Sequence, residues 1–365
     1  MGDLWRWTRQ PIALLTEKAA TAPVFRLRLW RPAIVGYRPD WNRAILGDLD
    51  TFRARSSLSD LTPYLAAGIV HADVPDHDQR RYTLNPNFHN RGIAPLRARL
   101  ATVAADAAPL GRFEALAWSS LIVRRMLNEA FFAGRLPDRL LYTFLRPLHA
   151  SMPQPLLPRP LLFRRMDKAI RAVLADPPPS TLAAGLAGMP SAAEEIRVAL
   201  SAGYDTTTHT LAWLLWHLAG APDWRTPQAL PAVVDEVLRL YPSGWIGSRV
   251  ASTDTVVTGV PIAAGTLVLY SPYLTHHDPD LWPDPHAFQP GRFVRGRPAW
   301  GFLPFGAGRR TCLGTHLARA MLHAAVAPCL EGRLEQVFGD PTVRAGLTLR
   351  PAGPLWLDRA PRSPK

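Results

Sequence analysis

The sequence predicts a mostly α-helical fold with a small β region, built as a single domain. The chain has 365 residues, 47% of them hydrophobic, which is ample for a core. Long apolar runs indicate helices, the longest over residues 192–218. Residues 255–275 instead combine Val and Thr with Pro and Gly, which indicates strands and turns. The 37 prolines cluster at residues 153–160 and 177–179, where they are typical of connections between helices.

The remaining elements are expected in chain order. Residues 1–21 carry five charged side chains, so no apolar span of membrane length is expected there. Strands are expected over residues 24–35, and an apolar, alanine-rich helix is expected near the C-terminus over residues 313–330. Further helices are expected at residues 40–46, 76–85, 95–107, 113–132, 138–150, 161–174 and 231–241. Further short strands are expected near Arg249, Val256, Leu267, Leu347 and Leu355.

One cysteine lies on a glycine-rich loop, FGAGRRTCLG at residues 305–314, at the start of the last helix. The N–H groups and the dipole of a helix N-terminus favour an ionised sulfur, the form that binds metal. Gly308 and Gly314 are expected to let the backbone approach a flat ligand closely. A single thiolate of this kind suits a haem iron. The alternative is that Cys312 is a small buried hydrophobic residue.

The pattern F-x-x-G-x-R-x-C-x-G in this loop resembles the most specific signature of the cytochrome P450 family. The resemblance extends from about residue 24 to the C-terminus. It implies one haem-enclosing domain over residues 1–365 with the cytochrome P450 fold, in which residues 1–23 are an N-terminal extension. It also implies haem b (iron protoporphyrin IX) as cofactor. By resemblance the haem-binding loop residues are Phe305, Gly306, Arg310, Gly314 and the proximal iron ligand Cys312.

A second motif is E-x-x-R, at Glu236 and Arg239. Residues at i and i+3 share one helix face, and such a pair is usually a solvated salt bridge of little energetic value. Apolar neighbours favour partial burial here. By resemblance, Arg292 in the segment PGRF completes a Glu-Arg-Arg cluster with a structural role beneath the haem.

The helix over residues 192–218 contains AGYDTT at residues 202–207, which matches the family's oxygen-activation pattern. Reduction of bound dioxygen needs two protons, which Asp205 and Thr206 can relay as catalytic residues. Gly203, beside Ala202, is expected to leave room for oxygen, and Thr206 to bond the preceding turn and open the helix locally. The alternative is that Asp205 or Thr206 caps a separate helix.

The two haem propionates need cationic partners if they are buried. His77 and Arg81 stand at i and i+4, where the resemblance places propionate ligands, and Arg249 and Arg310 occupy further positions of this kind. Arg80 is an alternative to Arg81. Each of these side chains could also be a solvated surface charge.

By resemblance, the substrate pocket draws on residues 57–70, 244–247 and 350–353 and on the oxygen-activation helix. Its individual candidates are Ala199, Ala202, Thr206, Trp245, Ile246 and Pro351. Their types favour a small apolar or aromatic substrate, of the kind found in specialised metabolism. Trp245 is equally consistent with a core position. The chain is short for the family, and the connections at residues 152–160 and 217–235 are expected to be reduced, which affects closure of the pocket.

The formal net charge is +13 and the isoelectric point is near 10.6, which raises the alternative of a nucleic-acid binder. The arginines are scattered without a dense block, so a protein partner with an acidic face fits better. The resemblance implies an external ferredoxin with its reductase, which Arg80, Arg309 and Arg319 could steer. A fused reductase is not expected, because no G-x-G-x-x-G follows a strand.

Cys312 and Cys329 are too far apart on the expected helix for a disulfide, which indicates a reducing compartment. Cysteine–histidine zinc binding is not expected, because C-x-x-C and H-E-x-x-H are missing from the sequence, and His276 and His277 are expected in a surface turn. A soluble, cytoplasmic monomer is the resulting expectation.

The function expected from the resemblance is that of a haem-thiolate monooxygenase, which inserts one oxygen atom of dioxygen into a C–H or C=C bond of a small molecule. Oxidative radical coupling and a peroxide-driven reaction are alternatives that keep the haem, although the Asp205-Thr206 pair favours dioxygen. A haem-binding sensor or carrier without turnover is an alternative from another class.

Overall fold

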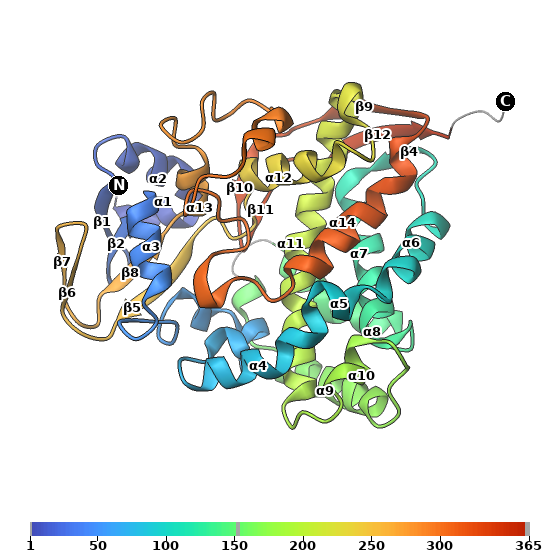
Figure 1. Cartoon of the computed structure of the whole chain (residues 1–365), viewed down its shortest axis with the longest axis horizontal. Helices are drawn as coiled ribbons and strands as arrows, with labels where there is room; N and C mark the ends of the chain where they lie inside the picture. Colours follow the sequence, from blue (N-terminus) through green and yellow to red (C-terminus); the bar gives the residue numbers. More distant parts are fainter. Residues whose placement is uncertain (1, 151–153, 362–365) are drawn as a thin grey trace.

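The computed structural model describes residues 2–150 and 154–361. Figure 1 shows a helical part on one side and, around the N-terminus, a smaller part that contains a sheet. The helices are α1 (Asp3–Arg9), α2 (Pro11–Ala19), α3 (Pro39–Gly47), α4 (Asp76–Phe88), α5 (Asn90–Ile93), α6 (Leu96–Asp106), α7 (Ala115–Phe132), α8 (Asp138–Leu145), α9 (Pro160–Leu174), α10 (Leu182–Leu186), α11 (Ala192–Gly220), α12 (Leu230–Leu240), α13 (Pro272–His276) and α14 (Thr315–Leu330). Among the described residues, none of these helices combines the length and hydrophobicity that a membrane span requires.

Four sheets complete the fold. The largest has the strand order β1-β2-β8-β5-β3, in which β2 and β8 are parallel and the other neighbours are antiparallel. A second sheet has the order β4-β12-β9, and β6-β7 and β10-β11 are two-stranded. The strands are β1 (Val24–Arg28), β2 (Pro32–Gly36), β3 (Phe52–Arg53), β4 (Gly111–Glu114), β5 (Gly247–Ala251), β6 (Thr255–Val257), β7 (Val260–Ile262), β8 (Leu267–Tyr270), β9 (Arg333–Gly339), β10 (Val343–Ala345), β11 (Leu349–Pro351) and β12 (Leu355–Ala360).

Helix α11 is the centre of the helical part. Its 29 residues pack against α7, α9, α12 and α14, and most of its side chains are buried. A helix that is apolar on nearly every side is stable only inside a protein. Ala202 is nevertheless exposed, and Gly203 and Thr206 are half-buried, so this long helix has one open strip. The helix is continuous through these residues, which excludes the alternative of a separate, capped helix after residue 206.

The mostly α architecture with a small β region is therefore as predicted, with local differences. The described part of the predicted N-terminal extension forms α1 and α2, and Leu14 and Leu15 are completely buried against residues of the large sheet. Strands β4 and β9 were not predicted. Their pairing partner, β12, lies far from β4 in the sequence, and local patterns do not reveal such pairing.

The connections at residues 152–160 and 217–235 contain short 3₁₀ turns. In the first, residues 152 and 153 lie outside the described part of the chain, and the 3₁₀ turn η5 (Gln154–Leu156) then leads to α9. In the second, a 3₁₀ turn, η6 (Pro222–Trp224), is the helical element between α11 and α12 among the described residues.

Candidate active site

Cys312 lies between the 3₁₀ turn η8 (Gly308–Arg310) and α14, which begins at Thr315 and not at residue 313 as predicted. The N–H of Cys312 donates to the carbonyl oxygen of Phe305 at 2.8 Å, and the Thr315 hydroxyl donates to the carbonyl oxygen of Cys312 at 2.8 Å. These two bonds fix the backbone, while the side chain of Cys312 is exposed. Desolvation by the surrounding protein raises the pKa of the thiol, and the Gly314 N–H and the Arg81 charge oppose this effect.

Two glycines of this loop have different surroundings. A Cβ at Gly314 would lie 3.9 Å from the sulfur of Cys312, an ordinary van der Waals distance, so its expected role towards a ligand stays a prediction. A Cβ at Gly308 would lie 2.7 Å from the carbonyl oxygen of Leu46, and the φ of Gly308 is +69°. Gly308 is thus required by its backbone conformation and by contact with α3, and its expected role towards a ligand stays a prediction.

Glu236, Arg239 and Arg292 come together in a buried cluster. The two Glu236 carboxylate oxygens accept from the Arg239 guanidinium at 2.8 and 2.9 Å, and Oε1 also accepts from Arg292 at 3.2 Å. Glu236 and Arg239 are fully buried. Arg239 also donates to the carbonyl oxygens of His276, Pro285 and Ala287. The cluster therefore links α12 to the chain between α13 and Arg292.

Three guanidinium groups from different elements face the same region as His77. Arg81 on α4 donates to the Thr311 carbonyl oxygen at 2.5 Å, and Arg249 on β5 donates to the Ser248 carbonyl oxygen at 2.7 Å. Arg310 on η8 donates to the carbonyl oxygens of the loop before α4, at Ile69, Val70 and Ala72. Burial and the charges of Arg249 and Arg81 lower the pKa of Arg310 to about 10, although Asp73 opposes them. Burial and the same group of arginines lower the pKa of His77 to about 4.

Comparison with a family model, with known proteins and with solved structures identifies the family of the chain. A family model described as "Cytochrome P450" matches residues 228–332, which include the Glu236 cluster and Cys312. A putative cytochrome P450 139 of Mycobacterium tuberculosis is 28% identical over 367 residues, covering 83% of this chain and 85% of that protein. The crystal structure of CYP175A1 from Thermus thermophilus aligns with a TM-score of 0.84 and 25% identity, over 98% of this chain and 97% of that one. The chain belongs to the cytochrome P450 family.

Another relative is the cyclooctat-9-en-7-ol 5-monooxygenase of Streptomyces melanosporofaciens, which is 34% identical over 199 residues. That match covers 46% of this cytochrome P450 and 43% of the streptomycete protein, so it spans less than half of the relative's length. A second structure, of a six-coordinated cytochrome P450 from Thermus thermophilus, aligns with a TM-score of 0.83 and 27% identity, over 96% and 98% of the two chains.

Family membership implies haem b, and the residues of this cytochrome P450 fit that group. Within the described chain, no ion pair joins Arg81, Arg249 or Arg310 to a carboxylate, and Nε of Arg249 is buried without a hydrogen-bond partner. Three such cations are costly unless anions accompany them. Two propionate groups would supply the missing negative charge, and the exposed thiol of Cys312 would supply an iron ligand.

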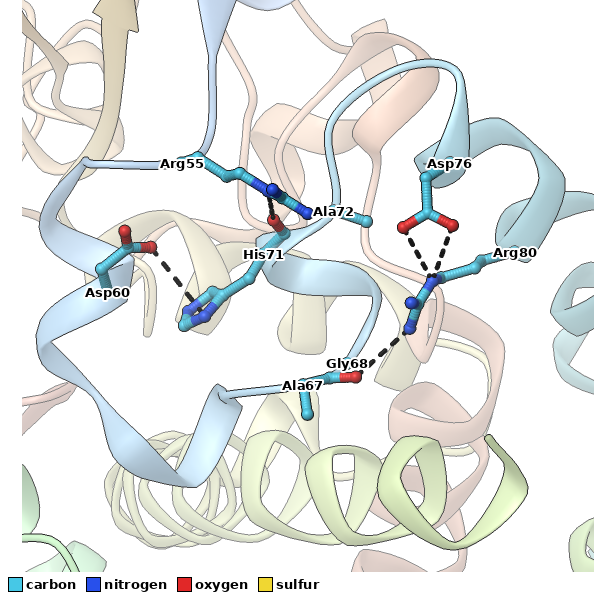
Figure 2. Close-up of a pocket in the computed structure, with 8 residues that line it drawn as sticks. All are labelled: Arg55, Asp60, Ala67, Gly68, His71, Ala72, Asp76 and Arg80. Atoms are coloured by element: carbon cyan, nitrogen blue, oxygen red, sulfur yellow. Dashed lines mark hydrogen bonds and ion pairs between the residues drawn. The ribbon is translucent and has the colours of Figure 1, made fainter. Parts of the chain in front are cut away.

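Arg80 is excluded as the alternative to Arg81. It pairs with Asp76 and with the buried Glu195, and it donates to the Ala67 carbonyl oxygen. Arg80 and Asp76 line a pocket of about 280 Å³. Figure 2 shows both side chains there, with Ala67, His71 and Ala72. The pocket's charged side chains interact with one another or with backbone, as in the bond from Arg55 to the His71 carbonyl oxygen at 3.2 Å.

The open strip of α11 contains Ala202, Gly203 and Thr206, three of the predicted oxygen-activation residues. The Thr206 hydroxyl donates to the carbonyl oxygen of Ala202 at 2.7 Å, as expected, although the helix stays regular. A Cβ at Gly203 would lie 3.4 Å from Cδ2 of Leu127 on α7. Gly203 therefore adjoins α7 at an ordinary van der Waals distance, and its expected role in leaving room for oxygen stays a prediction.

Asp205 does not share the open strip with Thr206. Its side chain is buried against His149, His209 and Thr348, and the Thr348 hydroxyl lies 2.8 Å from both Asp205 Oδ2 and His209 Nδ1. Consecutive residues on a helix point about 100° apart, so an adjacent pair cannot face one ligand in the same way. Burial raises the pKa of Asp205 and lowers the pKa of His209 to about 3. The D-x-x-x-H spacing was the signal in the sequence, and it was missed.

The expected substrate-pocket residues divide into two groups. Trp245 and the partly buried Ile246 pack in the hydrophobic cluster formed with β1, β2 and β8, and the indole N–H of Trp245 donates to the Gly346 carbonyl oxygen at 3.2 Å. Trp245 is thus a core residue and not a pocket wall. Ala199 is half-buried on α11, and Pro351 is buried on β11. The role of these two residues stays a prediction.

Two further expectations are corrected. His276 and His277 do not lie in a surface turn, because His276 is fully buried on α13 and its Nε2 accepts the Leu303 N–H at 2.7 Å. Arg309 and Arg319 are not free cations for steering a partner, because Arg309 pairs with Asp78 and Arg319 with the buried Asp235.

Proposed function

We propose that this cytochrome P450 is a haem-thiolate monooxygenase acting on a small, apolar or aromatic substrate. The observation that carries the proposal is that an exposed Cys312 thiol lies near three guanidinium groups that have no carboxylate partner in residues 2–150 and 154–361. Haem needs a ligand for its iron and cations for its two propionates, and this region offers both. Bound haem would supply activation of dioxygen and transfer of one oxygen atom to a C–H or C=C bond.

Different residues of the chain are assigned to haem binding, to stability of the cysteine loop and to proton delivery. When haem is bound, Cys312 would hold the iron, and Arg81, Arg249, Arg310 and His77 would bind and orient the propionates. The Glu236 cluster stabilises the segment after α13, which leads to the cysteine loop. In this proposal the Thr206 hydroxyl, in the open strip of α11, would relay a proton, and the buried Asp205 would supply the adjacent acid.

Electrons come, in this proposal, from a separate ferredoxin with its reductase. The +13 net charge favours an acidic partner in general terms. Arg80, Arg309 and Arg319 contribute little to the attraction of such a partner, because each is paired with a carboxylate. Electrostatic attraction of the ferredoxin therefore depends on the charge of the whole protein and not on these three side chains.

The difference spectrum of the dithionite-reduced protein with CO tests the proposal. We expect a strongly red-shifted Soret band, its loss in Cys312→Ser, and its retention in the matched control Cys329→Ser, because Cys329 is buried in α14 away from the loop. A wild-type band at the position of histidine-ligated haem would reject thiolate ligation.

Turnover separates a monooxygenase from a sensor. With a substrate and a surrogate ferredoxin system, Thr206→Ala should divert reducing equivalents to hydrogen peroxide while the substrate still shifts the haem spectrum. If the wild-type protein accepts no electrons and shows no substrate-induced spin change, the haem-binding sensor replaces the enzyme.

A further inference from the structure

Three polar side chains, among them the Asp205 of the proposed proton delivery, converge behind the open strip of α11. His149 ends the 3₁₀ turn η4 (Arg146–His149), and Asp205 and His209 lie four residues apart on one face of α11. One nitrogen or oxygen atom from each residue lies within 4.8 Å of the other two. Asp205 Oδ1 is 3.3 Å from His149 Nε2 and 3.6 Å from His209 Nδ1.

Each of these three side chains has one buried polar atom without a hydrogen-bond partner among the described residues. Within the described chain, His149 Nε2, Asp205 Oδ1 and His209 Nε2 are all buried and have no hydrogen-bond partner. A buried polar atom without a partner costs about 1–3 kcal/mol, and folded proteins contain few of them. Three such atoms at one place indicate that a bound species completes their coordination.

We propose that His149, Asp205 and His209 bind a divalent transition-metal cation of the zinc class. Two imidazoles and a carboxylate are ligands that such ions prefer, and three protein ligands leave a position for water. Tetrahedral bonds of about 2.1 Å place neighbouring ligand atoms about 3.4 Å apart. The 3.3 Å between His149 Nε2 and Asp205 Oδ1 already has this length.

Surrounding groups hold the ligands in orientation. The Thr348 hydroxyl can accept the Nδ1–H of His209 and donate to Asp205 Oδ2, each at 2.8 Å, which leaves His209 Nε2 and Asp205 Oδ1 free. Partners of this kind normally set the tautomer and direction of metal-binding histidines. The His149 ring stacks on Tyr204 with centroids 4.5 Å apart, and Arg350 donates to the His149 carbonyl oxygen at 2.8 Å. Among the described residues no ion pair joins Arg350 to Asp205, although the charge of Arg350 opposes the rise in the pKa of that carboxyl.

The site has a route to solvent and a consequence for turnover. The His149 side chain is 17% exposed, whereas Asp205 and His209 are 3% exposed, so an ion would enter past His149. The consequence rests on the proposed monooxygenase function. A carboxylate bound to a metal cannot pass a proton to Thr206, so occupation of the site would divert electrons to peroxide.

Zinc binding to the haem-loaded protein tests the inference. The protein is treated with a chelating resin and dialysed against ZnCl₂ at pH 7.5, and zinc per chain is measured by mass spectrometry. We expect one zinc per wild-type chain, loss of this zinc in His209→Ala and Asp205→Asn, and retention in His286→Ala, which removes an exposed histidine outside the site. Thr348→Val should weaken binding about 10- to 100-fold, since it removes the orienting hydroxyl.

The outcomes are distinct. No stoichiometric zinc, or equal zinc in the wild type and both triad variants, would overturn the inference and leave bridging water as the species between these atoms. The ferrous-CO band of each variant shows whether it is folded and loaded, and Thr348→Val provides a test if the triad variants lose it. A chain that binds zinc without a thiolate-type band would defeat only the proposed function, and a thiolate-type band without zinc would defeat only this inference.

Discussion

Replacement of Glu236 by alanine tests how the buried cluster stabilises the fold near the cysteine loop. Glu236 accepts from Arg239 at 2.8 and 2.9 Å, from Arg292 at 3.2 Å and from the Gln289 N–H at 2.8 Å. Removal of the carboxylate leaves the Arg239 charge unpaired at a fully buried position. Breaking a buried ion pair in this way costs about 3–5 kcal/mol, so we expect this loss of unfolding free energy.

Urea unfolding of the haem-loaded protein at pH 7.5, followed by circular dichroism, measures this loss. Glu335→Ala is the matched control, because its pair with Arg333 has a similar distance of 3.3 Å but side chains that are 58% and 51% exposed. The control should lose about 1 kcal/mol or less. If Glu236→Ala is no less stable than Glu335→Ala, the cluster does not stabilise the fold as argued.

Three further predictions concern haem retention, core packing and pH. Arg310→Gln should release haem to apomyoglobin at least tenfold faster than the wild type, whereas Arg309→Gln, at a neighbouring exposed position, should not; equal rates would remove Arg310 from the propionate site. Trp245→Ala should destabilise the fold by about 3–5 kcal/mol in urea without changing the spin shift caused by substrate; a changed shift would return Trp245 to the pocket. Burial lowers the pKa of His217 from 6.5 to about 4, so its stabilising contribution is complete above pH 6.5 and is lost as the pH falls towards 4. In His217→Gln the drop in unfolding free energy between pH 7.5 and pH 5 should be about 2 kcal/mol smaller than in the wild type, and an unchanged drop would contradict the buried neutral imidazole.

Local patterns predicted the parts of the site that depend on neighbours in the sequence. The E-x-x-R spacing placed Glu236 and Arg239 on one helix face, and the structure has them in contact there. Thr206 reaches the carbonyl oxygen four residues earlier for the same reason, because helix geometry brings i and i−4 together. Strand β4 escaped prediction, since its four residues are stabilised by β12, about 240 positions later.

The roles of individual glycines and buried polar residues depended on contacts that a sequence does not display. Gly203 and Gly308 contact α7 and α3, and neither helix is a sequence neighbour. His149 lies 56 positions before Asp205, and only the packing of η4 against α11 brings their side chains together.

The sequence by itself determined the family, the helical architecture and the cysteine loop, because helix periodicity, glycine-rich loops and short motifs act over a few residues. The tertiary structure decided that Arg81 rather than Arg80 faces the other cations, that Trp245 is a core residue, and that Asp205 joins two histidines. These outcomes depend on hydrogen bonds, ion pairs and packing contacts between segments that are far apart in the sequence. Burial and charge pairing, unlike helix periodicity, are properties of the assembled fold.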